Sequence, residues 1–324
     1  ARLILAAGQT PAIRAWQIDG RAIGGIGDIP GYVNQCVWSP DGKEIAAVCS
    51  DDTVRLLSPD GTPRAVINSA NVACWHPTDD AVIVADPAGT VRVHSTDGSQ
   101  LAVLGEHENV SMLATNPKHN LIASAASGGS VRLWNLETST NKVFEKSNRF
   151  RRHIEWSPDG EWLASFEAGA NVGLWRKDGT AVPALKSKSP TSTGCWLPAN
   201  KLLAATFAYP NRVDALYPFP DSETTMEPLL ETSSFIGHTA PISSLDAVEP
   251  GGRFVSCSND NTIRLWNIET GKEEWIAVIL PEGKSVTIDR TGHILDMDRD
   301  AEKHLVYIVE REPGKPELMS FDEF

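Results

Sequence analysis

The sequence predicts an all-β protein built as a closed ring of four-stranded antiparallel sheets. Three observations lead to this fold class. A strand motif resembling Val-Arg-Leu-Trp recurs along the chain, a proline or glycine turn recurs with it about every 42 residues, and no long segment has the apolar period of a helix. One such unit cannot bury both faces, whereas units stacked around a ring cover one another and remove most exposed sheet edges.

Each repeat reads as four short strands, most clearly over residues 242–279. Strands are expected at 242–248, 254–258, 262–267 and 274–279, because turns rich in Pro, Gly, Asn and Asp separate them. The third-strand motif can be counted eight times, ending in chain order at or near Trp16, Leu57, His94, Trp134, Trp175, Tyr217, Trp266 and Ile308. Eight copies favour a ring of eight sheets, with seven as the alternative.

The repeats predict a single domain over residues 1–324. Its first unit begins with what reads as a second strand, Leu3 to Ala7, so we expect the chain to be cut from a longer protein whose upstream residues complete that unit. Residues 218–234 are polar and contain prolines, which predicts a surface loop insertion. Residues 303–324 hold the most degenerate copy, expected to form the closing unit of the ring.

Composition excludes several classes of function. The 324 residues include 42 Asp and Glu against 29 Lys and Arg, a net charge of −13. This balance argues against binding to nucleic acid or to an anionic membrane, which needs a net basic face. The five cysteines include no CxxC pair, so neither a zinc site nor a disulfide framework is expected, and the expected location is cytoplasmic.

One repeat carries a distinctive set of polar and aromatic residues at fixed places, namely Gly237, His238, Ser256, Asp260 and Trp266. Through this repeat and the repeat length, the chain resembles the WD40 repeat family over essentially its whole length. The resemblance implies a WD40-type β-propeller. It also implies a structural network of hydrogen bonds joining the His, Ser, Asp and Trp of this repeat, which would satisfy buried polar groups.

Other copies depart from the family pattern. Before Trp134 the Gly-His pair becomes Glu106-His107, Ser124 is kept, and Gly128 stands at the Asp place. Most units therefore lack the full network and are expected to depend on packing.

No motif of an enzyme is present. The chain contains no GxSxG, HExxH or phosphate-binding loop, so we expect no catalytic residue, no metal and no cofactor. Asp296, Asp298 and Asp300 share one face of an extended strand. Because Ala301 and Tyr307 replace the Gly and Glu of a calcium loop, a solvated acidic edge is the favoured interpretation and weak cation binding the alternative.

One basic patch stands out in this acidic chain, comprising Arg149, Phe150, Arg151 and Arg152. Arginine recognises carboxylates and phosphates through paired hydrogen bonds, and phenylalanine adds an apolar anchor. One interpretation is a site for an acidic or phosphorylated peptide, with Tyr32 as a rim aromatic at the equivalent place of another unit. The other is a solvated loop whose arginines pair with acids of neighbouring units.

The resemblance implies a non-catalytic platform for protein–protein interaction, or a partner-sensing regulatory domain, with its ligand face on the side of the Gly237-His238 loop. The expected partners are proteins or peptides, acidic or phosphorylated ones included, and neighbouring domains of a longer chain. The Trp-Ser-Pro-Asp-Gly turns at Trp38 and Trp156 also resemble TolB-like propellers. The alternative function is therefore a propeller associated with a hydrolase or binding a small ligand in its central channel, and a purely structural module is a third possibility.

Overall fold

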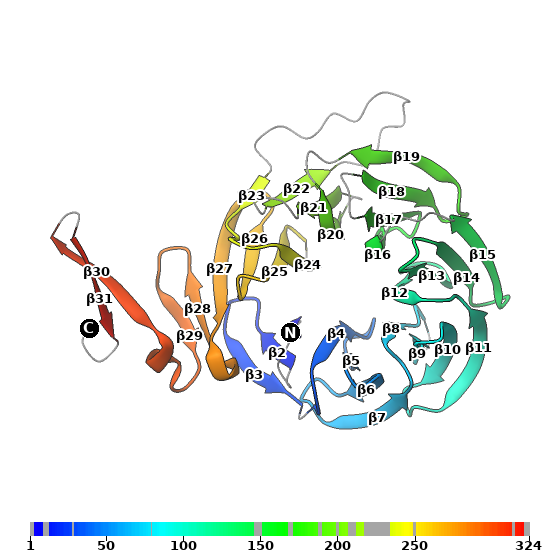
Figure 1. Ribbon diagram of the computed structural model, residues 1–324, viewed down its shortest axis with the longest axis horizontal. Coiled ribbons are helices and arrows are strands. Elements are labelled where there is room, and N and C mark those ends of the chain that lie inside the picture. The colour runs from blue at the N-terminus through cyan, green and yellow to red at the C-terminus, as the bar shows by residue number, and fades with distance from the viewer. Residues whose placement is uncertain are drawn as a thin grey trace.

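The computed structural model describes residues 3–8, 13–27, 29–78, 80–145, 151–167, 171–186, 190–198, 201–206, 212–216, 234–248, 251–312 and 315–320. Seven antiparallel sheets stand side by side as the blades of a closed ring (Figure 1). No α-helix occurs in these residues. The structure is therefore the all-β propeller that the repeats predict.

The blades are numbered in chain order, each running from its innermost to its outermost strand. Blade 1 has three described strands, β1 (Ile4–Ala6), β2 (Ile13–Trp16) and β3 (Ala22–Ile26). Blade 2 comprises β4 (Val33–Trp38), β5 (Ile45–Cys49), β6 (Thr53–Leu57) and β7 (Pro63–Asn68). Blade 3 comprises β8 (Val72–Trp75), β9 (Ala81–Ala85), β10 (Thr90–Ser95) and β11 (Gln100–Glu106). Blade 4 comprises β12 (Val110–Thr115), β13 (Leu121–Ala126), β14 (Val131–Asn135) and β15 (Thr140–Glu145).

Blades 5 and 6 repeat the four-stranded plan. Blade 5 comprises β16 (Arg151–Trp156), β17 (Trp162–Glu167), β18 (Asn171–Arg176) and β19 (Ala181–Lys186). Blade 6 comprises β20 (Thr191–Leu197), β21 (Lys201–Thr206), β22 (Arg212–Leu216) and β23 (Ser234–Ile236). Blade 7 comprises β24 (Ile242–Val248), β25 (Arg253–Ser258), β26 (Thr262–Asn267) and β27 (Lys272–Ile279), and its sheet continues into β28 (Ser285–Asp289) and β29 (Ile294–Met297).

Burial falls from the second strand of a blade to its outermost strand. Strands β5 and β9 are buried along their whole length, because each lies in a sheet covered by blades on both sides. Strand β11, at the rim, is mostly exposed. Seven clusters of buried apolar side chains fill the seven contacts between adjacent blades, including that between blades 7 and 1. The hydrophobic core is thus itself a ring.

Tryptophans near the ends of the innermost strands join adjacent blades by hydrogen bonds. The indole Nε1–H of Trp75 donates to the carbonyl oxygen of Val37 at 3.0 Å, and that of Trp156 donates to Ala114 at 3.2 Å. Each bond runs from the innermost strand of one blade to that of the preceding blade. The bulky ring fills the space between blades while its N–H satisfies a carbonyl group.

Polar contacts from the β28–β29 hairpin strengthen ring closure. Asp298 forms an ion pair of 3.0 Å with Arg14 of blade 1, and Asp296 accepts a hydrogen bond of 2.6 Å from the backbone N–H of Ala22. The expectation of a solvated acidic edge is therefore wrong for Asp296 and Asp298, which are engaged between the first and last blades, whereas Asp300 is exposed and pairs with Lys303.

The ring has seven blades, the alternative number, and closes differently from the expected degenerate unit at 303–324. The eighth counted motif lies in β30 (Val306–Glu312), which pairs with β31 (Lys315–Ser320) as a two-stranded hairpin outside the ring (Figure 1). Because Trp16 of blade 1 already packs against blade 7, the interface is filled without another blade. The predicted insertion at 218–234 lies outside the described residues apart from its last residue.

Candidate functional site

The two faces of the ring carry different connections between strands. The Gly-His face carries the links from each outermost strand to the next blade and those from second to third strands, including the Gly237-His238 loop. The turn face carries the links from first to second and from third to fourth strands.

On the Gly-His face, His238 lies at the centre of a buried network in blade 7. Its Nε2 is 2.7 Å from the Ser256 hydroxyl oxygen and its Nδ1 is 2.9 Å from the Asp260 carboxylate. The indole N–H of Trp266 donates to Ser256 at 2.8 Å. Hydrogen bonds from His238, Thr262 and the Thr239 backbone hold the pKa of Asp260 well below its usual range, although burial opposes them. His, Ser and Asp are side chains that could serve in catalysis, but here each of them is hydrogen-bonded to other residues of the same blade.

Blade 4 builds a similar network without the carboxylate. The two ring nitrogens of His107 are each 2.7 Å from a hydroxyl oxygen, of Ser124 and of Ser130, and Trp134 donates to Ser124 at 2.8 Å. Burial, and then the nearby Arg132 guanidinium, lower the pKa of His107 to about 4. The histidine is therefore held neutral by its surroundings.

This pKa shift predicts that His107 weakens the fold in acid. The unfolded chain binds its proton near pH 6.5 and the folded chain only near pH 4, so stability falls as the pH drops through this window, by up to about 3 kcal/mol. We expect urea unfolding at pH 7 and pH 4.5 to show a smaller loss for His107→Asn than for the unchanged chain. His293→Asn, at an exposed turn, is the matched control. Equal losses for all three chains would contradict the prediction.

Arg151, at the start of β16, takes the corresponding place in blade 5. Its guanidinium donates to the hydroxyl of Ser165, to Glu167 at 3.2 Å and to the carbonyl oxygen of Gly129 at 2.9 Å. It also lies over the Trp175 ring, 5.0 Å from the centroid. The side chain is fully buried, so Arg151 cannot contact a partner. The prediction that Arg151 belongs to a binding patch on the surface is therefore wrong.

The other members of the expected partner site differ in whether the structure describes them and in how exposed they are. Arg149 and Phe150 lie outside the described residues. Arg152 is exposed beside Arg151, at a register shift in the pairing of β16 with β17. Tyr32 is 53% exposed, and its backbone is held by two bonds with Ser50: Tyr32 N–H donates to Oγ at 3.1 Å, and Ser50 N–H donates to the Tyr32 carbonyl at 2.9 Å. The Gly-His face thus presents an aromatic ring on a fixed loop.

The innermost strands bring ionisable residues to the centre of the ring. His153 Nε2 and Glu155 Oε2 lie 3.5 Å apart on β16. Asp246 lies on β24, and its side chain is accessible to water. Partial desolvation by the surrounding protein, and then the like charge of Glu155, raise the pKa of Asp246 to about 7. This group could not be predicted from the sequence, because Asp246 comes from a different blade than His153 and Glu155.

Cavities open on the turn face, opposite the expected ligand face. One of about 640 Å³ lies among the turns of blades 3, 4 and 5, and one of about 260 Å³ lies between blades 2 and 3. Their walls come from turns whose sequences indicate only where one strand ends and the next begins.

No helix in the described part of the chain has the length and apolar character needed to cross a membrane. The same residues contain no cluster of three or more His, Cys, Asp and Glu side chains placed to hold a metal ion. The five cysteines are free thiols.

Comparison with known proteins identifies the repeats. Residues 26–58, 98–135 and 230–267 match the family described as WD domain, G-beta repeat. The chain is 24% identical over 182 residues to the SIR4-interacting protein SIF2 of Saccharomyces cerevisiae, covering 51% of this chain and 32% of that protein. It is 53% identical over 36 residues to Mitochondrial division protein 1 of Mycosarcoma maydis, covering 11% of this chain and 4% of that protein. The matched regions thus span a third or less of each relative.

Proposed function

Because this chain is a WD40-repeat protein that folds as a seven-bladed β-propeller, we propose that it is a non-catalytic platform for protein–protein interaction. WD40 propellers commonly serve in this way, although the fold alone does not fix the function. The name of one relative describes a protein that interacts with another protein, SIR4. We extend only the general role, protein interaction, to this chain.

The observation that carries the proposal is how the polar residues are used. The His, Ser and Asp side chains that could serve in catalysis are bonded within blades 4 and 7, at His107 and His238. Their hydrogen bonds tie the loops before β12 and β24 to strands, and two hydrogen bonds with Ser50 hold the loop of Tyr32. Rigid loops that hold an exposed aromatic side chain are suited to partner binding, because little order must be gained when the partner docks.

We place the main partner site on the Gly-His face, around Tyr32 and Arg152. Tyrosine and arginine are the side chains most often responsible for strong interface contacts, and both are exposed here. An acidic or phosphorylated segment fits the arginine, since a guanidinium recognises carboxylate and phosphate groups through paired hydrogen bonds.

The paired variant Tyr32→Ala/Arg152→Glu tests this site. We expect it to lose at least about tenfold of the affinity for partners recovered with the unchanged chain, while its thermal unfolding is little altered. The matched control, Leu101→Ala/Arg290→Glu, changes an exposed apolar residue and an exposed arginine elsewhere. Quantitative affinity purification from the source cells compares the three chains. An identical set of partners for all three would remove the site.

The alternative, a small ligand in the central channel, has one observation in its favour. Glu155 and Asp246 bring carboxylates to the axis, and the raised pKa of Asp246 reflects their mutual repulsion as well as the surrounding protein. A cationic ligand would relieve this repulsion. Saturable binding of such a ligand, abolished by Asp246→Asn, would favour this function over the platform.

A further inference from the structure

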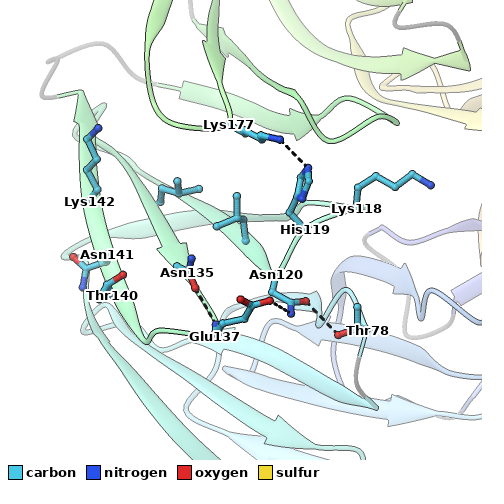
Figure 2. Close-up of a pocket in the computed structure, with 12 residues that line it drawn as sticks. Thr78, Lys118, His119, Asn120, Asn135, Glu137, Thr140, Asn141, Lys142 and Lys177 are labelled. Atoms are coloured by element: carbon cyan, nitrogen blue, oxygen red, sulfur yellow. Dashed lines mark hydrogen bonds between the residues drawn. The ribbon is translucent and has the colours of Figure 1, made fainter.

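The larger cavity on the turn face is assembled from three consecutive blades. Thr78 comes from the β8–β9 turn, Lys118 and Asn120 from β12–β13, Glu137 from β14–β15 and Lys177 from β18–β19 (Figure 2). Its volume, about 640 Å³, lies within the range of roughly 300–1,000 Å³ usual for binding pockets.

Hydrogen bonds across blades hold the cavity in shape. Thr78 donates to the side-chain oxygen of Asn120 at 3.3 Å, and the amide of Asn120 donates to Glu137 at 2.8 Å. Asn135 accepts the backbone N–H of Glu137 at 3.0 Å. This series of hydrogen bonds, visible in Figure 2, joins a turn of blade 3 to two turns of blade 4. The cavity therefore needs little rearrangement to receive a ligand.

The lining is basic, in contrast to a protein with a net charge of −13. It contains three lysines, one histidine and one glutamate. Glu161, beside the cavity, accepts from Lys177 at 2.6 Å and lies 3.3 Å from His119, so it offsets Lys177. In the described part of the chain, neither Lys118 nor Lys142 lies within ion-pair distance of a carboxylate; the Lys142 ammonium donates to the carbonyl oxygen of Asp178 at 3.2 Å.

Two of these lysines stand at opposite ends of the cavity. Figure 2 shows Lys142 on one side of the cavity, together with Asn141 and Thr140, and Lys118 on the other, beyond His119. Between them the lining offers amide and hydroxyl groups, which can bond the backbone of an extended chain. Leu121 and Leu133 add apolar surface.

We propose that this cavity binds an acidic, extended segment of a partner protein, with carboxylate side chains directed to Lys118 and Lys142. The assignment rests on charge complementarity: two positive charges lie apart at the ends of a polar cavity, on a molecule whose net charge is −13. It goes beyond the proposed function, because it adds a second site on the face opposite Tyr32. The platform could then hold two partners at once.

The test uses a fluorescein-labelled peptide of alternating Glu and Ser and a matched peptide of Gln and Ser. We expect the acidic peptide alone to bind the unchanged protein, and Lys118→Glu/Lys142→Glu to weaken that binding about tenfold or more at low salt. Because the Debye length shrinks from ~10 Å at 0.1 M salt to ~3 Å at 1 M, high salt should weaken binding as well. The control variant Lys272→Glu/Arg290→Glu makes the same change of net charge on exposed residues elsewhere and should bind within about twofold of the unchanged chain.

Three results would overturn the proposal: equal binding of the two peptides, equal weakening by the two charge-reversal variants, or binding of inorganic phosphate without the acidic peptide. The Tyr32→Ala/Arg152→Glu protein should keep the part of the acidic-peptide binding that Lys118→Glu/Lys142→Glu removes. Loss of peptide binding in the cavity variant alone, and loss of other partners in the Tyr32 variant alone, would separate this site from the one on the Gly-His face.

Discussion

We expect Arg151→Ala to lower the free energy of unfolding by about 3–5 kcal/mol, which is typical when one partner of a buried ion pair is removed. The guanidinium is fully buried and is bonded to Ser165, Glu167 and the carbonyl oxygen of Gly129. Its removal leaves the nearly buried carboxylate of Glu167 without this partner and uncovers the face of Trp175. Each lost contact acts in the same direction, so the effect should be large.

Two further variants separate this mechanism from a general effect of lost charge. Arg152→Ala, one residue along β16 and exposed, should change stability by about 0.5 kcal/mol or less. Arg151→Lys should fall between, because lysine keeps the charge but lacks the planar fork that bonds two acceptors at once. The measurement is denaturant unfolding of the three variants and the unchanged chain. A similar loss for Arg151→Ala and Arg152→Ala would show that the buried network is not stabilising.

The run around Arg151 shows how far a polar segment can be interpreted from sequence. Strict strand alternation counted back from the buried Ile154 and Trp156 places Arg152 inward. The register shift between Arg151 and His153, which the sequence does not mark, breaks this alternation. The structure places Arg151 inward, where its long side chain reaches Ser165 much as His238 reaches Ser256 in blade 7. A surface patch and a buried network therefore have the same sequence pattern here.

The ring itself could be predicted, because each repeat carries its own turns, strands and large aromatic side chain. Blade number was harder to predict, because a third-strand motif marks a strand and not a whole blade. The motif near Ile308 belongs to β30, which lies in a two-stranded hairpin rather than in a blade. Closure of the ring depends on how the first and last blades pack together, and no short sequence pattern indicates that packing.

The cavity on the turn face could not be predicted for a related reason. Thr78, Asn120 and Lys177 are separated by about one repeat or more along the chain, and each lies in a polar turn like many others. Only stacking of the blades brings them together. The bonds of Trp75 and Trp156 to the preceding blades could not be predicted for the same reason, although both residues stand just before a turn that contains proline.

Ring closure leads to the second large expected effect, that of Trp16→Ala. Trp16 of blade 1 is fully buried among Val255, Leu265 and Trp275 of blade 7. Truncation removes a large side chain from the one interface that joins the two ends of the ring, and we expect a loss of about 3–5 kcal/mol. Hydrogen exchange should increase most in β1–β3 and β24–β27, because these strands lose their shared cover. An even increase around the ring would contradict this account.

Trp16→Phe distinguishes packing from hydrogen bonding at the same position. In the described part of the chain the indole Nε1 of Trp16 is buried without a hydrogen-bond partner, whereas that of Trp134 donates to Ser124 at 2.8 Å. Phenylalanine removes an unsatisfied donor in the first case but breaks a network that includes His107 in the second. We therefore expect Trp134→Phe to be more costly than Trp16→Phe by about 1 kcal/mol, measured by denaturant unfolding. If Trp16→Phe proves the more costly change, the indole N–H must have a partner, and closure of the ring involves a polar contact as well as packing.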